Sequence, residues 1–172
     1  MQQDESTLLN SSGSPQSSAS EKKLMMLKLP ADQISNMWNL FEYALWNSVP
    51  PGITPSEGFL ANTLAACIAG DLQCWLSFQK RADNTREILG VVITYIDNDE
   101  CSGDKNLLIY SLYGYGKMPT RMWAEGMETL KKYAKGAGCK RILAFTSHEN
   151  VMKIAKFLDC NAEVSVLQWE IE

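Results

Sequence analysis

The chain has 172 residues, 45% of them hydrophobic, which suits one globular domain with a real core. Its formal net charge is −4 and its charged residues are mixed, so we expect no nucleic-acid-binding surface, which needs clustered Lys and Arg. Five scattered cysteines with one histidine predict neither structural zinc nor a disulfide framework, and the lack of a signal peptide or a membrane-length apolar run predicts a cytoplasmic protein.

The N-terminal residues 1–23 are rich in Ser, Gln and acidic residues and hold almost nothing to bury. This composition predicts a flexible tail, with a short docking segment around Leu8 and Leu9 as the alternative. The apolar run LMMLKL at 24–29 then predicts a first strand, so the folded domain is expected to cover residues 24–172.

Two helices are predicted next. The first begins near Asp32 and ends before Pro50, since apolar residues recur at helical spacing between them. The second begins at the sequence Thr54-Pro55-Ser56-Glu57, which is typical of a capping box with proline at the first helical position, and it ends at Gly70.

Three strand-like segments follow at 74–79, 88–96 and 106–114, and polar, turn-rich stretches separate them. Short polar connections between strands predict an antiparallel meander. The meander would form the middle of the domain.

The second half of the chain alternates helices and strands. A long amphipathic helix is predicted from Thr120 to Gly136 with Gly138 as its stop, followed by a buried strand at 141–147, a helix capped by Ser147, and a closing strand EVSVLQWEI. The predicted order is βααβββαβαβ. The fold class is therefore α/β, in the α+β sense, with a mixed, largely antiparallel sheet and helices on both faces.

The stretch LYGYGKMPTRMW at 112–123 is the first candidate site. A strand that ends in glycines and runs into a helix start exposes backbone N–H groups and the positive end of the helix dipole, which suit a phosphate. An ordinary turn is the alternative interpretation of the same residues.

The order of elements, with GAGCKRILAFTSHEN after the long helix, resembles the GNAT superfamily of N-acetyltransferases over about residues 24–172. The segments WNLFE, AGDLQCWL and LYGYG are most similar to GNAT-like proteins of bacteriophages. The resemblance implies acetyl-CoA as cofactor, bound in a cleft where two central strands splay apart.

The resemblance also implies cofactor contacts. The backbone of Ser111, Leu112 and Tyr113 would face the gap between the fourth and fifth strands, and Gly114 and Gly116 would shape the phosphate loop. The family's asparagine at the start of its fourth helix is matched by Asn150.

The family's pyrophosphate motif, R/Q-x-x-G-x-G/A, falls at 118–123, where Thr120 lies inside the frame and Arg121 and Trp123 fill its two small positions. Lys117 and Arg121 would supply charge to phosphates, with a solvated basic turn as the alternative. Because the small residues are missing, we expect acetyl-CoA binding to be weak or absent.

A proton carrier is the remaining requirement. The tyrosine that the family often uses as general acid on its fourth helix corresponds to Phe157, which has no proton to give. The candidates for proton transfer are therefore Tyr110 and Tyr113 on the central strand, Glu100 near its entry, and His148, whose ordinary pKa lies near neutrality, and of these Tyr113 and His148 are the predicted catalytic residues.

Two functions remain open at this stage. One is an acyl-CoA-dependent N-acyltransferase with an altered phosphate loop, acting on a small-molecule or protein amine. The other is a non-catalytic GNAT-fold phage protein in virion assembly or host interaction, found in the host cytoplasm or the virion, as a homo-oligomer or with a phage protein partner. Fold alone does not decide between them.

Overall fold

The computed structural model describes residues 24–162 and residue 169. Its five strands are β1 (Leu24–Lys28), β2 (Leu72–Lys80), β3 (Arg86–Asn98), β4 (Lys105–Gly114) and β5 (Arg141–Ala144). Its helices are α1 (Ala31–Ile34), the 3-10 turn η1 (Ser35–Met37), α2 (Trp38–Asn47), α3 (Phe59–Ala69), α4 (Thr120–Gly136) and α5 (Glu149–Phe157).

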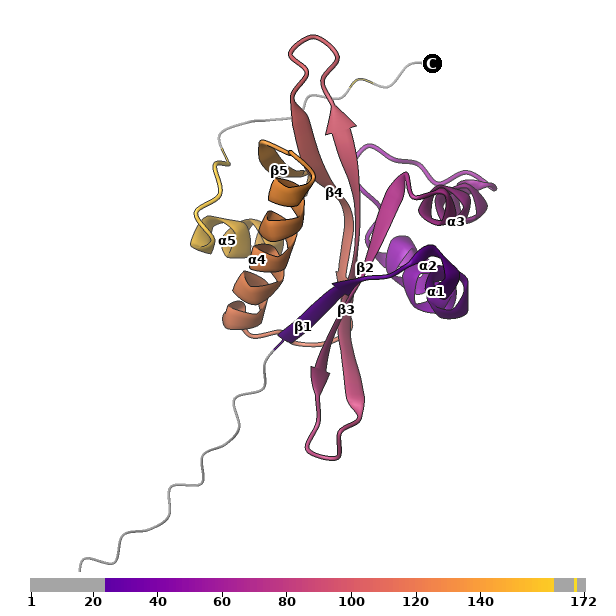
Figure 1. Cartoon of the computed structure of the whole chain (residues 1–172), viewed down its shortest axis with the longest axis vertical. Coiled ribbons are helices and arrows are strands. Elements are labelled where there is room, and N and C mark those ends of the chain that lie inside the picture. The colour runs from indigo at the N-terminus through magenta and orange to yellow at the C-terminus, as the bar shows by residue number, and fades with distance from the viewer. Residues whose placement is uncertain (1–23, 163–168, 170–172) are drawn as a thin grey trace, which may run out of the picture.

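The strands form one sheet in the order β1-β2-β3-β4-β5 (Figure 1). The first four strands pair antiparallel, and the short loops 81–85 and 99–104 join β2, β3 and β4, so the predicted meander is confirmed. β5 pairs parallel to β4 because α4 carries the chain back across the sheet between them. The fold class predicted from the sequence is confirmed.

Helices cover both faces of this sheet (Figure 1). α1, α2 and α3 pack on one face over buried residues such as Phe41, Cys74 and Phe78, a set that we call the α1–α3 core. α4 packs on the other face over Trp75, Leu107 and their neighbours, which we call the α4 core. Neighbouring β2 residues contribute to different cores because successive strand side chains point to opposite faces.

The first predicted helix is interrupted. The 3-10 turn Ser35–Met37 separates α1 from α2, and the Asn36 side-chain amide donates to the Asp32 carbonyl, 3.4 Å away. Asn and Ser side chains compete for backbone hydrogen bonds, which disfavours them inside a helix. The single helix expected from Asp32 is therefore two short helices.

The second helix begins later than predicted. The N-cap of α3 is Gly58, which makes no side-chain capping bond, so the capping box expected at Thr54 is wrong. Gly58 would lie inside the first turn of a helix begun at Pro55, where glycine costs about 1 kcal/mol relative to alanine. Instead the Phe59 N–H donates to the Ser56 carbonyl, 3.0 Å away, in a turn.

The α4 boundaries match the sequence prediction, and Gly138 follows with φ of +78° as its left-handed stop. The predicted Ser147 cap is wrong, because the α5 N-cap is His148, without a side-chain capping bond.

The predicted closing strand and the predicted tail at 1–23 fall on residues outside the described ones, apart from Trp169. No helix in the described part of the chain is long and apolar enough to cross a bilayer.

Candidate functional site

A β-bulge interrupts β4 at Tyr110. Ile93 of β3 pairs with Ser111 and the next residue, Thr94, pairs with Ile109, so Tyr110 is the extra residue on β4. A bulge bends its strand and re-aims the side chains beside it, and such irregularities concentrate next to binding sites. The Tyr110 bulge therefore marks where β4 changes course.

β4 and β5 part directly before this bulge. Their last paired residues are Ile109 and Ala144, whereas β4 continues for five more residues to Gly114. Among the described residues, the stretch 110–114 thus has β3 on one side only, and none of these residues pairs with its other edge, which leaves that edge open to another hydrogen-bonding chain or to solvent. This divergence agrees with the splayed strands implied by the sequence resemblance.

The residues that present their backbone at the open edge can be assigned. The Tyr115 N–H donates to the Leu89 carbonyl, 2.9 Å away, so this opposed pair is a hydrogen-bonded one. Alternation along an antiparallel pair then turns Tyr113 and Ser111 toward β3, and turns Leu112 and Gly114 toward the open edge. The prediction that Ser111 and Tyr113 also face the gap needs correction, and only Leu112 of the three does so.

The open edge leads into the loop before α4. Neither Gly114 nor Gly116 has a positive φ, so their backbone conformation does not require glycine. A Cβ atom placed on Gly116 would meet nothing within 4 Å, which leaves free space at this point of the loop. α4 then begins after Pro119 without a side-chain cap, leaving first-turn N–H groups for a ligand or water.

The three polar side chains expected near the cofactor phosphates differ in their contacts. Lys117 and Thr120 are exposed beside the start of α4. Arg121 is also exposed, but its Nε donates to the Glu125 carboxylate, 3.1 Å away, and that carboxylate accepts the Leu24 N–H at 2.8 Å. Arg121 thus belongs to a contact between α4 and β1. The comparison with the family's pyrophosphate motif did not predict this contact.

Tyr113 belongs to a cluster of three tyrosine rings. Its ring lies edge-on to Tyr43 of α2 at 5.7 Å and to Tyr115 at 5.2 Å between centroids. The side-chain hydrogen bond with Tyr43, together with desolvation, raises the pKa of Tyr113 above that of an ordinary phenol, which is itself protonated at neutral pH. Tyr113 is therefore suited to donate a proton rather than to accept one.

A serine pair fixes the strand beside the bulge. The Ser48 hydroxyl donates to the Ala44 carbonyl at 2.8 Å and lies 2.7 Å from the Ser111 hydroxyl. Because Ser48 has one hydroxyl proton, Ser111 must donate to Ser48. The side chain of Ser111, 4% exposed, thus ties β4 to the end of α2.

The candidates at α5 form a second group, on the opposite side of the sheet from α2 (Figure 1). The His148 N–H donates to the Thr146 hydroxyl at 3.0 Å, and Asn150 is exposed in the first turn of α5. The Phe157 side chain is 68% exposed at the other end of this helix. No hydrogen bond joins His148 to Tyr113 in the described structure.

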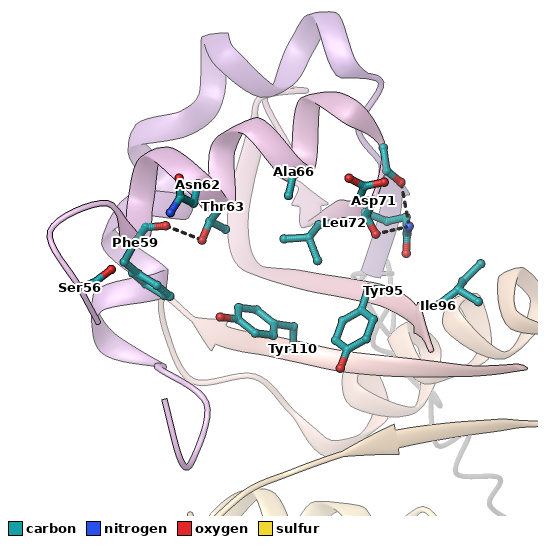
Figure 2. A pocket seen from close by; sticks show the side chains of 12 residues that line it. Ser56, Phe59, Asn62, Thr63, Ala66, Asp71, Leu72, Tyr95, Ile96 and Tyr110 are labelled. Carbon is teal, nitrogen blue, oxygen red and sulfur yellow. Dashed lines mark hydrogen bonds between the residues drawn. The ribbon is translucent and has the colours of Figure 1, made fainter. Parts of the chain in front are cut away.

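A groove of about 760 Å³ opens beside the bulge, between α3 and the strands β3 and β4 (Figure 2). Figure 2 shows Phe59 and Thr63 of α3 on one side and Tyr95 and Tyr110 on the other. The volume lies in the range of small-molecule sites. Through Tyr110 the groove borders the point where β4 and β5 part.

Several of these residues were missed by the sequence reasoning. Tyr43 falls outside the apolar spacing of its helix, which was the one signal available in the sequence. The structure leaves this side chain 55% exposed. Ser48 and Tyr95 gave no signal, because their importance depends on contacts with distant parts of the chain. No group of potential metal ligands gathers within the described residues.

Comparison with known proteins finds similarity in structure only. No family model and no curated protein matches the sequence. A ribosomal-protein-alanine N-acetyltransferase from Brucella melitensis matches with a TM-score of 0.60 at 11% identity, covering 86% of this chain and 99% of that one.

Two further solved structures give the same result. An aminoglycoside N-acetyltransferase in complex with CoA has a TM-score of 0.62 at 15% identity, covering 87% of this chain and 95% of that one. A predicted acetyltransferase with acetyl-CoA from Clostridium acetobutylicum has a TM-score of 0.61 at 15% identity, covering 86% and 96%. The chain therefore has the fold of the GNAT acetyltransferases.

Proposed function

We propose that this protein is an acyl-CoA-dependent N-acyltransferase that moves an acetyl group to an amine. The observation that carries the proposal is the open edge of β4 after the Tyr110 bulge, which leads directly to the uncapped start of α4. Structural neighbours with this fold include an aminoglycoside N-acetyltransferase bound to CoA. The open backbone groups and the free space at Gly116 fit an elongated cofactor that carries phosphates.

Acetyl-CoA would supply an activated thioester, from which an acetyl group passes to the amine nitrogen as the C–N bond forms and the C–S bond breaks. Leu112 and Gly114 would hold the cofactor arm through their backbone N–H and C=O groups. Gly116, Lys117 and Thr120 would surround the phosphates, and Arg121 would join them only by leaving Glu125. Asn150 would contact the cofactor from α5.

Two side chains have proposed roles in proton transfer. Tyr113 would protonate the departing thiolate, because a phenol carries its proton at neutral pH. His148 would accept the proton that the amine loses, directly or through water. Tyr113 packs against the α1–α3 core, and His148 precedes α5, a helix on the other side of the sheet from α2 (Figure 1).

Titration calorimetry with acetyl-CoA tests the proposal. We expect weak binding, because Arg121 and Trp123 stand where the family motif has small residues. Gly116→Leu should abolish it by filling the loop, whereas the matched Gly136→Leu, which also meets open space, should not. A dissociation constant near ~1 μM, about −8 kcal/mol, would show that the loop compensates fully for the altered motif.

Tyr113→Phe tests the proposed acid. We expect turnover, followed by release of free CoA thiol, to fall roughly 10²-fold with little change in acetyl-CoA affinity. Tyr133→Phe is the control, because that phenol belongs to the α4 core on the other face. Unchanged turnover in Tyr113→Phe would remove this hydroxyl from the mechanism.

A non-catalytic role, as an assembly or host-interaction component of a phage, is the second candidate. Its support is Phe157, an exposed ring without a proton where the family often has its acid. If the protein neither binds acetyl-CoA nor turns over any amine, this candidate is favoured over the first.

A further inference from the structure

A second pocket lies on the face of the sheet that α1, α2 and α3 cover (Figure 1). It has a volume of about 340 Å³ and is bordered by β1, β2, β3 and the segment that contains α1 and η1. Most of its wall is apolar and consists of Leu27, Leu29, Met37, Leu76, Phe78 and Ile88. Its volume is at the lower end of the range of small-molecule sites, and its wall favours a ligand with an apolar chain.

This pocket, which we call the β1–β3 pocket, runs from the core to the surface. Phe78 and Leu76 belong to the α1–α3 core and are buried, whereas Leu27 on β1 is 37% exposed. An apolar chain that entered beside Leu27 would therefore contact side chains that are already shielded from water. Each buried methylene group of such a chain adds to the free energy of binding.

Arg86 is the one charged side chain among the described residues that line the β1–β3 pocket. Its guanidinium group lies over the Phe78 ring, 5.1 Å from the ring centroid. A guanidinium group that is stacked on a ring keeps its N–H donors in its own plane, where they match the two oxygens of a carboxylate. The pocket therefore combines an apolar wall with a donor for one anionic group.

A second cation stands directly opposite the first. Lys80 of β2 pairs with Arg86 of β3 in the ladder, and both side chains are exposed. Lys80 lies on the same face of the sheet as Phe78, two residues before it, because strand side chains alternate between the faces. Like charges at directly opposed positions destabilise a strand pair, so this position favours an anion between them.

The carboxylates nearest in sequence are engaged elsewhere. Glu87 follows Arg86, but it accepts the Gln79 side-chain amide at 2.7 Å and pairs with Arg81 at 3.2 Å. Asp32 accepts the side-chain amide of the pocket residue Gln33 at 3.3 Å but does not itself line the pocket. In the described part of the chain no ion pair joins the two opposed cations to a carboxylate. A bound anion would reduce their repulsion.

We infer that the β1–β3 pocket binds a medium-chain fatty carboxylate, with its chain along the apolar wall and its carboxylate at Arg86 and Lys80. This site is separate from the proposed acyltransferase site, because α4, whose first turn would meet the cofactor phosphates, packs on the other face of the sheet. The larger groove beside the bulge suits such a ligand poorly, since Asp71 is the one charged side chain among its described lining residues.

Titration of ¹⁵N-labelled protein with matched ligands tests both parts of the inference. Octanoate should shift the amide signals of Leu27, Leu76 and Ile88 and leave those of Thr63 and Asp71 unchanged. Hexanoate, which is shorter by two methylene groups, should bind roughly tenfold more weakly. 1-Octanol, which has the same chain without the charge, should bind about fivefold more weakly than octanoate.

Three results of this titration would overturn the inference. The first is the absence of shifts at millimolar octanoate. The second is equal affinity for octanoate and 1-octanol, which would mean that the cations do not select an anion. The third is a set of shifts at Thr63 and Asp71 in place of those at Leu27, Leu76 and Ile88, which would assign the ligand to the larger groove.

Variants of the two cations give a second measurement. Arg86→Gln and Lys80→Gln should each weaken octanoate binding about two- to fivefold, the range of an exposed ion pair, without changing the affinity for 1-octanol. Lys132→Gln, which removes an exposed lysine on α4, is the matched control and should leave both affinities unchanged. Equal octanoate affinity in the wild type and in the Arg86→Gln, Lys80→Gln double variant would contradict the inference.

A variant of the apolar wall completes the test. Leu27→Trp places a larger side chain at the exposed end of the pocket and should abolish binding of both octanoate and 1-octanol. Ile68→Trp, at an exposed position of α3 outside the pocket, is its control and should bind both ligands as the wild type does. The ¹⁵N spectrum of each variant verifies that it is folded. Unchanged octanoate binding in folded Leu27→Trp would place the ligand outside this pocket and overturn the assignment.

Discussion

Tyr115 shows how one side chain links the loop to the helices. Its hydroxyl donates to the Leu40 carbonyl at 2.6 Å, and burial, with smaller contributions from Tyr113 and Tyr43, raises its pKa to about 12. Because the folded pKa lies above the ordinary value of 10, the contribution of this phenol to stability is complete below pH 10 and is lost as pH rises toward 12.

Tyr115→Phe tests this pH dependence. The difference in free energy of unfolding between wild type and variant should be constant from pH 7 to 9 and should shrink by pH 11, where the phenol begins to ionise in the unfolded chain. Urea denaturation at these pH values measures it. Equal differences at pH 9 and pH 11 would contradict the raised pKa.

At the residue scale, the sequence predicted the site only in part. Its choice of Leu112 for the open edge agrees with the backbone alternation, but its choice of Ser111 and Tyr113 does not, and Gly114, expected only in the phosphate loop, also turns its backbone toward that edge. One bulged residue, Tyr110, changes which residues face which neighbour, and nothing in the local sequence announces it. The groove was not predicted, because its walls come from distant segments.

At the element scale, β3 and β4 approach unusually closely at Gly90. A Cβ atom on Gly90 would lie 2.6 Å from the Tyr113 carbonyl oxygen, a backbone atom that can move only with its strand. We therefore expect Gly90→Ala to lower the free energy of unfolding by about 1–3 kcal/mol and to displace β4 near the open edge.

Gly116→Ala is the matched control for this prediction. Its added methyl group meets nothing within 4 Å, so the free energy of unfolding should change by less than about 0.5 kcal/mol. Urea denaturation of both variants gives the comparison. Equal stabilities would mean that β3 and β4 separate here without cost.

The elements themselves were more predictable than their contacts. α4 was predicted to the residue, because its apolar spacing and its glycine stop are local signals. The meander was predicted for the same reason, since polar turns separate its strands. The break at Ser35–Met37 and the late start of α3 were not, because each depends on a balance of about 1 kcal/mol between helix and turn.

At the scale of the whole molecule, the sheet separates two cores that are covered by different helices. Three short helical segments close the α1–α3 core, while one long helix closes the α4 core. The proposed site lies beside the end of β4, and α2 and α5 lie on opposite sides of the sheet (Figure 1). This arrangement follows from the order of elements, which the sequence already indicated.

The open edge of β4 has a consequence for sequence divergence. Binding of a ligand held by the N–H and C=O groups of Leu112 and Gly114 would depend on the backbone conformation and not on the identity of the side chains. Substitutions that preserve the path would then be neutral for binding. Recognition of this kind can persist while the sequence drifts, which fits a chain that matches solved acetyltransferases in shape at 11–15% identity and matches no family model.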